Sequence, residues 1–289
     1  MEFSIVFKLM RPHQYVKNIF IFMPMFFALK ITDLDLFSDT LIAFIAFSLT
    51  ASAIYTLNDY HDIEEDKEHP KKRYRPLASG AISKPQAISI MTILFIAGFS
   101  LMAFLSLEAT AILAAYVVMN ITYSFYLKHI SIVDVTTIAI GFVLRLFVGS
   151  AVTDIHLSMW IVIMTFLLAL FLALTKRRDD VLIYESTGKK MRKVIDGYNL
   201  QFLDTSMAIM ASIVIVAYIM YTTSAEVVER IGSQYLYLTA LFVIIGIMRY
   251  LKIAFVLKDS GSPTKIVLKD RFTQLILLAW IVSFAWVLY

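Results

Sequence analysis

The sequence predicts an all-α, polytopic integral membrane protein, and three observations support this fold class. Of the 289 residues, 60% are hydrophobic and 17% are charged, whereas about a quarter of the residues in a soluble domain are charged. The charges leave long uncharged runs between them, and lysine and arginine gather in alternate loops. A helix needs about 20 apolar residues to cross a ~30 Å hydrocarbon core, which the longest runs supply. We therefore expect a single transmembrane helical domain over residues 1–289.

The uncharged runs place about nine transmembrane helices along the chain. Seven runs are about 18 residues or longer, namely 40–58, 85–107, 109–127, 155–175, 205–225, 231–248 and 272–289. Two further apolar segments complete the count: 18–29, which Pro24 bends, and 131–153, which Arg145 interrupts.

Lysine and arginine predict the orientation of these helices. With nine spans, 23 of the 26 cations fall on one side of the membrane, in loops that include the N-terminus. Only Lys30 and Arg230 fall on the other side. Because short cytoplasmic loops carry the Lys/Arg excess, we expect a multi-pass protein of the cell inner membrane with a cytoplasmic N-terminus. The N-terminal residues form an amphipathic segment without the pattern of a cleavable signal peptide. Cysteine is absent, which excludes disulfides and thiolate metal sites.

An acidic motif follows the second expected helix. It consists of Asn58, Asp59, Asp62 and Asp66, and three of these residues are spaced by four. If the helix continues, their side chains share one face, on which like charges repel. A divalent cation would remove the repulsion, and oxygen ligands favour Mg²⁺. We expect Asn58, Asp62 and Asp66 to bind the metal and Asp59, Asp62 and Asp66 to act in catalysis. The alternative, a solvated acidic helix end, fits neighbours such as Glu64 better.

A basic run follows the acidic motif directly. Pro70 and Pro76 break the helix here and can turn the chain back. The cations between or beside them are Lys71, Lys72, Arg73 and Arg75. Because the arginine fork matches phosphate oxygens, carboxylates followed by such cations predict a site for a metal-bound diphosphate at the membrane surface.

These residues resemble a known family. Asn-Asp-x-x-Asp-x-x-x-Asp at 58–66, with Arg75-Pro76 and Gly80, resembles the first signature of the UbiA superfamily of intramembrane prenyltransferases. The resemblance covers nearly the whole chain, including the number of helices. It implies an all-helical bundle around a central cavity, capped on the cytoplasmic side and open laterally to lipid.

The chain departs from the usual pattern of that superfamily at one place. Usual members carry a second motif, Asp-x-x-x-Asp, after the sixth span. Here the sequence reads Lys-Arg-Arg-Asp-Asp at 176–180, and Ile183 and Tyr184 stand four residues after the two aspartates. Three cations thus stand where carboxylates are expected. They fit either an anion site or simple positive-inside anchoring.

Arg145 is the most unusual charge within the expected spans. It lies eleven residues after Asp134, which is about 16 Å along a helix and near the middle of the bilayer. An arginine at this depth is costly and almost always faces a bundle interior or a polar cavity. A structural ion pair with another buried group is the alternative.

Several segments together resemble one branch of the superfamily, the polyprenyl-phosphate phosphoribosyltransferases. They are Arg11-Pro-x-Gln-x-x-Lys17-Asn18, the extension from His69 to Pro76, the series Tyr123, Lys128, Asp134 and Arg145, and Lys176-Arg177-Arg178. The branch usually has Glu at the position of Asp180. The resemblance implies Mg²⁺-dependent transfer of 5-phosphoribose from phosphoribosyl pyrophosphate to a polyprenyl (decaprenyl-type) phosphate, with release of pyrophosphate. It also implies a role in cell envelope biosynthesis and suggests a homo-oligomer.

This resemblance assigns the remaining polar residues to two substrates. The donor would be bound by Lys72, Arg73, Arg75, Tyr123, Lys128, Asp134, Lys176, Arg177, Arg178 and Asp180. The acceptor phosphate would be bound by Lys17, Asn18 and Arg145. The acceptor is already an anion at neutral pH, so its attack needs no strong general base. Membrane lipids complete the expected partners, and we expect no nucleic acid among them.

Two rival functions remain open from the sequence. The first is a prenyltransferase of the same superfamily that moves a prenyl group from a prenyl diphosphate to an aromatic acceptor. The missing second aspartate motif counts against it. The second is a membrane transporter that uses Asp134 and Arg145 as coupling residues at the midplane. Pyrophosphate release that depends on substrate would distinguish an enzyme from a carrier.

Overall fold

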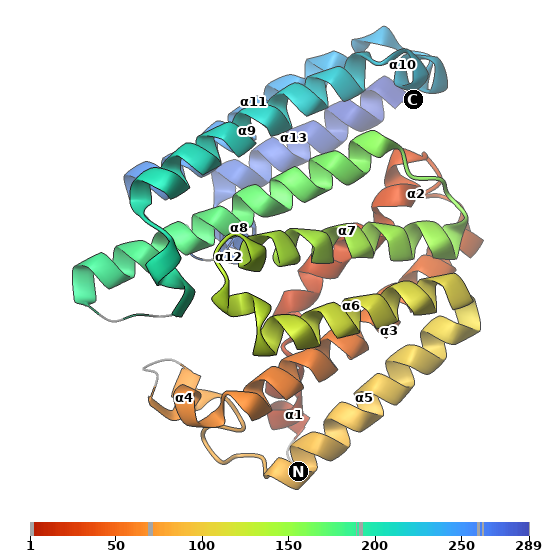
Figure 1. The fold of residues 1–289 in the computed structure, drawn as a ribbon. Coiled ribbons are helices and arrows are strands. Elements are labelled where there is room, and N and C mark those ends of the chain that lie inside the picture. Colours follow the sequence, from red (N-terminus) through yellow and green to blue (C-terminus); the bar gives the residue numbers. More distant parts are fainter. Residues whose placement is uncertain are drawn as a thin grey trace. The chain divides into compact units, whose positions relative to one another are not determined.

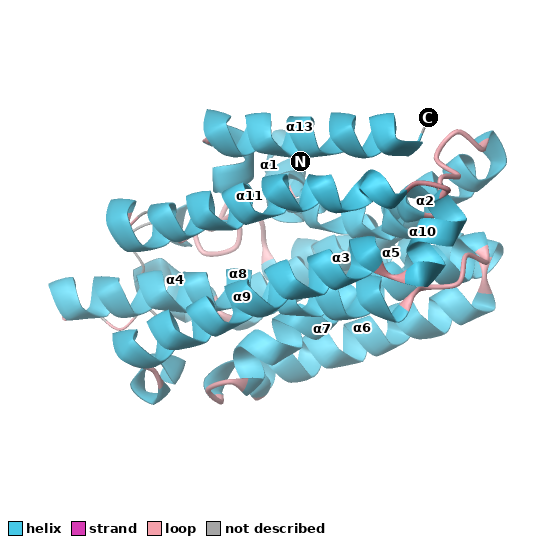
Figure 2. Cartoon of the chain, turned by 90° about the horizontal axis from the view of Figure 1, so that it is seen from above, coloured by secondary structure: helices cyan, strands magenta, loops and turns pink. Residues whose placement is uncertain are grey.

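The computed structural model describes residues 3–68, 72–188, 190, 193–258, 261 and 263–288. Over these ranges the chain forms helices and connecting loops and contains no strand, as Figure 2 shows. The all-α prediction is therefore confirmed. His69, Pro70 and Lys71, which the sequence places in the basic extension, lie outside the described residues.

The chain folds into two compact units. Unit 1 comprises Met1–Tyr126 and Gly141–Leu157, and unit 2 comprises Leu127–Ile140 and Ser158–Tyr289. Helix α7 (Val133–Thr153) contributes its first turns to unit 2 and its remainder to unit 1. The expectation of one domain over the whole chain stays a prediction, and each unit is described by itself.

Unit 1 is organised around the long helix α3 (Figure 1). Its elements are α1 (Phe3–Met10), η1 (Pro12–Phe22), α2 (Met23–Phe27), α3 (Leu34–His61), α4 (Ile63–Glu68), η2 (Lys72–Tyr74), α5 (Lys84–Leu105), α6 (Leu107–Phe125) and the second part of α7. Helix α3 contacts α1, η1, α5 and α6. Small residues allow this close packing, because Gly98 of α5 lies directly against Thr50 and the backbone of Ala46.

Polar caps fix the ends of these helices. The Asp33 carboxylate accepts from two backbone N–H groups at the start of α3. Ser83 and Gln86 form a capping box at the start of α5, where Pro85 occupies the first turn. Ser106 caps α6 immediately after α5 ends. Such caps satisfy N–H groups that the first turn of a helix leaves without partners.

Unit 2 is built from helices that follow one another along the chain. Its elements are η3 (Leu127–His129), the start of α7, α8 (Met159–Thr187), η4 (Lys193–Gly197), α9 (Leu200–Thr223), α10 (Ala225–Ile231), η5 (Gln234–Thr239), α11 (Ala240–Lys252), the π-helical η6 (Ile253–Leu257), α12 (Pro263–Lys269) and α13 (Arg271–Leu288). Helix α9 packs between α8 and α11, and α11 also contacts α13. Phe171, Leu203 and Met207 lie in the core of this unit.

Seven segments within the described ranges are long and apolar enough to cross a membrane. They are α3, α5, α6, α7, α8, α9 and Gln234–Leu257. Helix α13 is apolar but has a shorter qualifying stretch, Arg271–Val287. The chain is thus a multi-pass membrane protein, while the count of nine spans is not confirmed. The expected first span at 18–29 is instead divided between η1 and α2, with Pro24 near the junction.

The long 3₁₀ segment η1 has three residues per turn, and this period decides which side chains face the rest of unit 1. Tyr15, Asn18 and Ile21 follow one another at this spacing: the Tyr15 hydroxyl lies 2.8 Å from Ser52 Oγ, and Asn18 and Ile21 are buried. A 3₁₀ helix of eleven residues is unusually long, since the geometry of its hydrogen bonds is poor. We infer that packing holds η1 in this form.

Gly149 shows how closely η1 packs against α7. A Cβ atom added at this glycine would lie 2.0 Å from the backbone oxygen of Ile21. Gly149→Ala should therefore force backbone movement and lower the free energy of unfolding by about 1–3 kcal/mol. Unfolding titrations in detergent would measure this. Gly246→Ala in α11 is the matched control, because its Cβ would meet only Ile276 at an ordinary 3.7 Å. Equal effects at the two glycines would contradict the prediction.

Candidate functional site

The acidic motif lies where α3 gives way to α4. Helix α3 ends at His61, Asp62 forms the junction, and α4 begins at Ile63. The Asp62 N–H donates to the carbonyl of Asn58 at 3.0 Å, and the Asp66 N–H donates to the carbonyl of Asp62 at 2.8 Å. Hydrogen bonds between residues four apart are thus kept through the junction, although α3 itself ends before the motif is complete. That the side chains of the motif share one face stays a prediction.

Two carboxylates of the motif meet on one guanidinium. Asp59 and Asp66 are each 1% exposed. Arg75 Nη1 donates to Asp59 Oδ1 at 3.0 Å and to Asp66 Oδ2 at 2.6 Å. Arg11, at the left-handed junction between α1 and η1, also donates to Asp59. Arg75 therefore brings the segment after α4 back onto the motif, as the prolines predict.

One oxygen of each buried carboxylate is left without a hydrogen bond. These atoms are Asp59 Oδ2 and Asp66 Oδ1, and Lys72 Nζ lies 3.6 Å from the latter. Buried acceptors without donors cost free energy and call for an explanation. Carboxylate oxygens are the ligands that Mg²⁺ prefers, so these two atoms fit a metal ion.

The described residues alone do not complete the ligand shell of such an ion. Among the residues that the structure describes, no three His, Asp or Glu side chains are arranged to bind a metal. Mg²⁺ usually takes one or two carboxylates and completes its shell with substrate phosphates and water. The residues present therefore fit a metal that arrives together with a diphosphate.

The other two members of the motif have different contacts. Asn58 Oδ1 lies 2.5 Å from Ser124 Oγ, which fixes the orientation of this amide. Asp62 Oδ1 lies 2.9 Å from His61 Nδ1 and is closer to solvent than Asp59 or Asp66. The structure thus joins Asp59 and Asp66, and the expected participation of Asn58 and Asp62 in the metal site stays a prediction.

The cations of the basic run also differ in their contacts, and some of them reach the acidic motif. Lys72 and Arg75 reach Asp66, whereas Arg73 donates to the Tyr74 hydroxyl at 2.7 Å and lies over that ring. The expected phosphate contacts of these cations stay predictions.

A second cluster in unit 1 surrounds Arg145, which is 4% exposed. Its guanidinium donates to Asn18 Oδ1 at 2.8 Å, to the Gly141 carbonyl at 2.5 Å and to the Tyr116 hydroxyl at 3.1 Å. All three partners are neutral. The guanidinium also lies over the ring of Phe47, 4.9 Å from its centroid. The ion pair that the sequence left as an alternative is not among the contacts within the described ranges.

Lys17 and Asn18 belong to the same cluster, so unit 1 brings together the three residues predicted to bind the acceptor. Asn18 accepts from Arg145 and donates to Ser48 Oγ at 2.9 Å. Burial, and then the positive charges of Arg145 and Arg11, lower the pKa of Lys17 to about 8. Two cations are thus held close together beside neutral groups, an arrangement that favours an anion.

In unit 2, the expected donor residues form a buried ion-pair network. Arg177 and Asp134 are 1% and 0% exposed. Arg177 Nε donates to Asp134 Oδ2 at 2.5 Å, and Arg177 Nη1 donates to Asp180 Oδ2 at 2.8 Å. Tyr198 donates to Asp134 Oδ1 at 2.5 Å. Arg177 therefore meets carboxylates of its own unit, and three of the predicted residues lie together.

The remaining predicted donor residues belong to both units. Arg178 donates to Asp204 at 2.6 Å and to the Ala254 carbonyl at 2.7 Å. Lys128 lies in η3, and Lys176 and Tyr123 are half-buried in α8 and α6. Their contacts with the donor stay predictions.

Tyr198, Asp204 and Ser124 are functional candidates that the sequence did not identify. In the sequence, Arg11 stands out only as part of the segment Arg11–Asn18. Each lies far along the chain from its partner, so no local spacing connects them. The one available signal was their position beside the expected cytoplasmic ends of spans.

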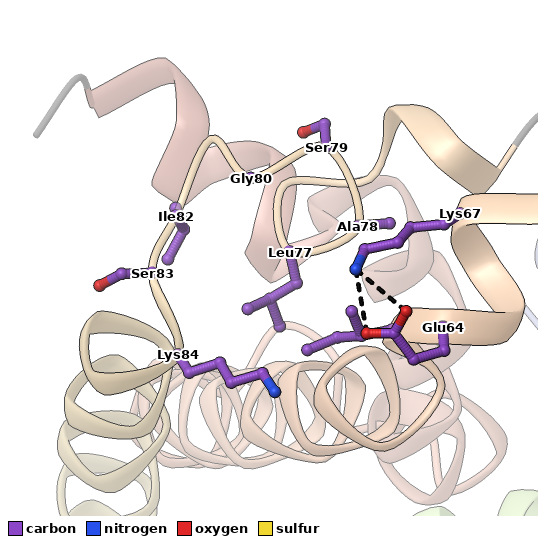
Figure 3. Close-up of a pocket in the computed structure, with 10 residues that line it drawn as sticks. Glu64, Lys67, Leu77, Ala78, Ser79, Gly80, Ile82, Ser83 and Lys84 are labelled. Atoms are coloured by element: carbon purple, nitrogen blue, oxygen red, sulfur yellow. Dashed lines mark hydrogen bonds and ion pairs between the residues drawn. The ribbon is translucent and has the colours of Figure 1, made fainter.

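Unit 1 also has an open surface cavity of about 430 Å³ (Figure 3). Its walls include Ile63, Leu77 and Ser83, and the ion pair between Glu64 and Lys67 lies along one side. None of the predicted site residues lines it. We assign no substrate to this cavity.

Comparison with known proteins identifies the family. The chain matches the UbiA prenyltransferase family over residues 19–276. It belongs to this family. The resemblance inferred from the acidic motif is thereby confirmed.

Similar relatives of this UbiA family member share most of its length. It is 30% identical over 284 residues to decaprenyl-phosphate phosphoribosyltransferase of Mycolicibacterium smegmatis, covering 95% of this chain and 89% of the relative. It is 29% identical to the protein of the same name from Corynebacterium glutamicum, with 98% and 86% covered. A UbiA homolog from Archaeoglobus fulgidus, solved with GPP and Mg²⁺, has the same fold, with a TM-score of 0.69, 16% identity and coverage of 98% and 99%.

The buried network of unit 2 gives a testable stability effect. Arg177→Met would remove the cation that pairs with the buried Asp134 carboxylate and leave its hydrogen bond from Tyr198. It should lower the free energy of unfolding by about 3–5 kcal/mol. Adding Asp134→Asn should restore part of the loss, because it removes the uncompensated charge. Unfolding titrations in SDS would measure both variants. A single variant as stable as the parent would show that the pair is not needed for the fold.

Proposed function

We propose that this UbiA family member transfers 5-phosphoribose from phosphoribosyl pyrophosphate to a polyprenyl phosphate of the decaprenyl type, with release of pyrophosphate. The observation that carries the proposal is the pair of buried carboxylates, Asp59 and Asp66, each with one oxygen that accepts no hydrogen bond. The near full-length similarity to decaprenyl-phosphate phosphoribosyltransferases supports this choice of substrates.

The donor end of the reaction is assigned to the acidic motif. Asp59 and Asp66, with Asn58 and Asp62 nearby, would hold Mg²⁺. When bound, the ion neutralises charge on the departing pyrophosphate. Arg75 already lies against both buried carboxylates, where its guanidinium can donate to pyrophosphate oxygens. Lys72 and Arg73 of unit 1 add cations for a donor that carries a second phosphate at its 5-position. The assignment of Lys128 and Lys176 of unit 2 to the donor comes from the sequence and is kept as part of this proposal.

In the transfer, the ribose C1 loses its bond to pyrophosphate and gains a bond to the polyprenyl phosphate. The C1–O bond to pyrophosphate breaks, and pyrophosphate leaves with the electron pair. An oxygen of the polyprenyl phosphate forms the new C1–O bond. The ring develops oxocarbenium character between these events, as in other glycosyl transfers. The attacking phosphate oxygen is already ionised, so no proton has to be removed.

The acceptor phosphate is assigned to Lys17, Asn18 and Arg145. Arg145 has neutral partners only among its three hydrogen bonds, and Lys17 adds a nearby positive charge. An anionic head group would supply the missing negative charge, and the apolar helices would accommodate the prenyl chain. The lysine and arginine distribution supports a cytoplasmic location for the acidic motif in the cell inner membrane.

Prenyl transfer to an aromatic acceptor is less well supported. That reaction uses two aspartate motifs, and this chain has cations at 176–178 where the second is expected. Arg177 and Arg178 are moreover buried against Asp134 and Asp204.

The decisive assay uses purified protein, polyprenyl phosphate, magnesium and labelled phosphoribosyl pyrophosphate. Label should enter the lipid phase, and pyrophosphate should appear in equal amount. Chelation of magnesium should abolish transfer. Asp66→Asn and Asp62→Asn should each lower kcat by about 100-fold or more, because each removes charge that stabilises the transition state.

Glu64→Gln is the matched control for these variants. Glu64 lies on the same short helix as Asp66, but its side chain is 78% exposed and pairs with Lys67. It should keep full activity. Turnover of a prenyl diphosphate and an aromatic acceptor, without labelled lipid, would contradict the proposal.

Lys17 predicts a pH dependence for acceptor binding. Because its pKa is lowered to about 8, the side chain is protonated below this pH and loses its charge above it. The KM for polyprenyl phosphate should rise about tenfold from about pH 7 to about pH 9, since the protonated fraction falls about tenfold per unit above the pKa. Lys17→Arg should abolish this rise. A rise that persists in Lys17→Arg would assign the titration to another group.

A further inference from the structure

Tyr198 contacts the turn that precedes α7. Tyr198 directly follows η4 and is 8% exposed. Its hydroxyl donates to Asp134 Oδ1 at 2.5 Å and accepts from the backbone N–H of Ile132 at 2.6 Å. One side chain thus binds both the turn and the first residues of the helix that follows it, all within unit 2.

The turn is strained at the residue that Tyr198 contacts. Ile132 has a φ of 70°, in the left-handed region. A β-branched residue is a genuine outlier there, because its side chain clashes with the backbone, and such a conformation persists only when its surroundings hold it. The hydrogen bond from its N–H to Tyr198 is a direct restraint of this kind.

A second contact holds the same turn from the same side. A Cβ atom added at Gly197 would lie 2.6 Å from Ser131 Oγ and 2.7 Å from Ser131 Cβ. Gly197 and Tyr198 are consecutive, as are their partners Ser131 and Ile132. η4 therefore packs directly on the turn, while its Val194 and Ile195 side chains are buried in the core of unit 2.

A network of hydrogen bonds and ion pairs holds the Asp134 carboxylate to which Tyr198 donates. Asp134 accepts from both Tyr198 and Arg177, and Arg177 also pairs with Asp180. Burial, and then the hydrogen bond to Asp134, raise the pKa of Tyr198, so its hydroxyl stays protonated and keeps donating. These groups contact one another, which explains their burial without a substrate.

We propose that Tyr198 and Gly197 are positioning residues that hold the turn at 127–132, and with it Lys128, in the conformation that binds the donor. This inference rests on the proposed function, because Lys128 is assigned to the donor phosphate there. It also changes the roles of Asp134 and Arg177: they support the turn through Tyr198 and do not contact the donor.

Tyr198→Phe is the first test, since it removes the hydroxyl and keeps the ring. The KM for phosphoribosyl pyrophosphate should rise about tenfold, with kcat and the KM for polyprenyl phosphate within about twofold of the parent. Hydrogen–deuterium exchange of the peptide spanning 127–133 should become faster. Gly197→Ala should shift the same quantities in the same direction, because its methyl group displaces Ser131.

Tyr218→Phe is the matched control for loss of stability. Tyr218 is also buried in unit 2, and its hydroxyl accepts from Trp280 at 2.8 Å and lies 2.8 Å from Thr239 Oγ1. Neither of these two hydrogen bonds involves the turn at 127–132. This variant should lower the unfolding midpoint and leave both the donor KM and exchange at 127–133 unchanged.

A second substitution, at Ile132, tests whether Tyr198 acts by positioning the turn or only by stabilising the fold. Glycine adopts a positive φ without steric cost, so Ile132→Gly added to Tyr198→Phe should return the donor KM to within about threefold of the parent. Unchanged exchange at 127–133 in Tyr198→Phe, or an equal rise of the donor KM in Tyr218→Phe, would overturn the proposal. If the parent protein transfers no phosphoribose, the proposed function fails, and the exchange comparison still decides whether Tyr198 holds the turn.

Discussion

A buried charge in this membrane protein costs free energy unless the protein or a bound ligand supplies its partners, because apolar surroundings offer no water to solvate it. This constraint organises both units. In unit 1, Arg75 holds Asp59 and Asp66 together and so returns the chain after α4 to the acidic motif. In unit 2, Asp134 and Arg177 connect the start of α7 with α8. Charge pairing therefore determines where the connecting segments lie.

Arg145 differs from the other buried arginines in the nature of its partners. A carbonyl, an amide and a hydroxyl accept from it, and aromatic rings cover its guanidinium. Such partners satisfy hydrogen bonds but leave the positive charge uncompensated. Arg177, in contrast, forms ion pairs with two carboxylates, which compensate its positive charge. The sequence led us to expect phosphate contacts for both residues. Their different surroundings are the reason that we propose binding for Arg145 and support for Arg177.

The sequence predicted the features that depend on local spacing. The uncharged runs located most of the spans, and the four-residue spacing of Asn58, Asp62 and Asp66 continued through the helix junction. It could not predict partners separated by many residues, such as Tyr198 for Asp134 or Ser124 for Asn58. It also missed the 3₁₀ form of residues 12–22, because packing against Gly149 and α3 determines that form and local propensity does not.

Because η1 has three residues per turn, its length determines which of its side chains face the rest of unit 1. Tyr15, Asn18 and Ile21 face inward, whereas Ile19, between the last two, and His13, before the first, are exposed. Each residue of a 3₁₀ helix turns the chain by about 120°. Insertion of one residue before Asn18 would therefore carry its amide a third of a turn away from Arg145. Related sequences should vary freely in side chains at the exposed positions of this segment but should not vary in its length.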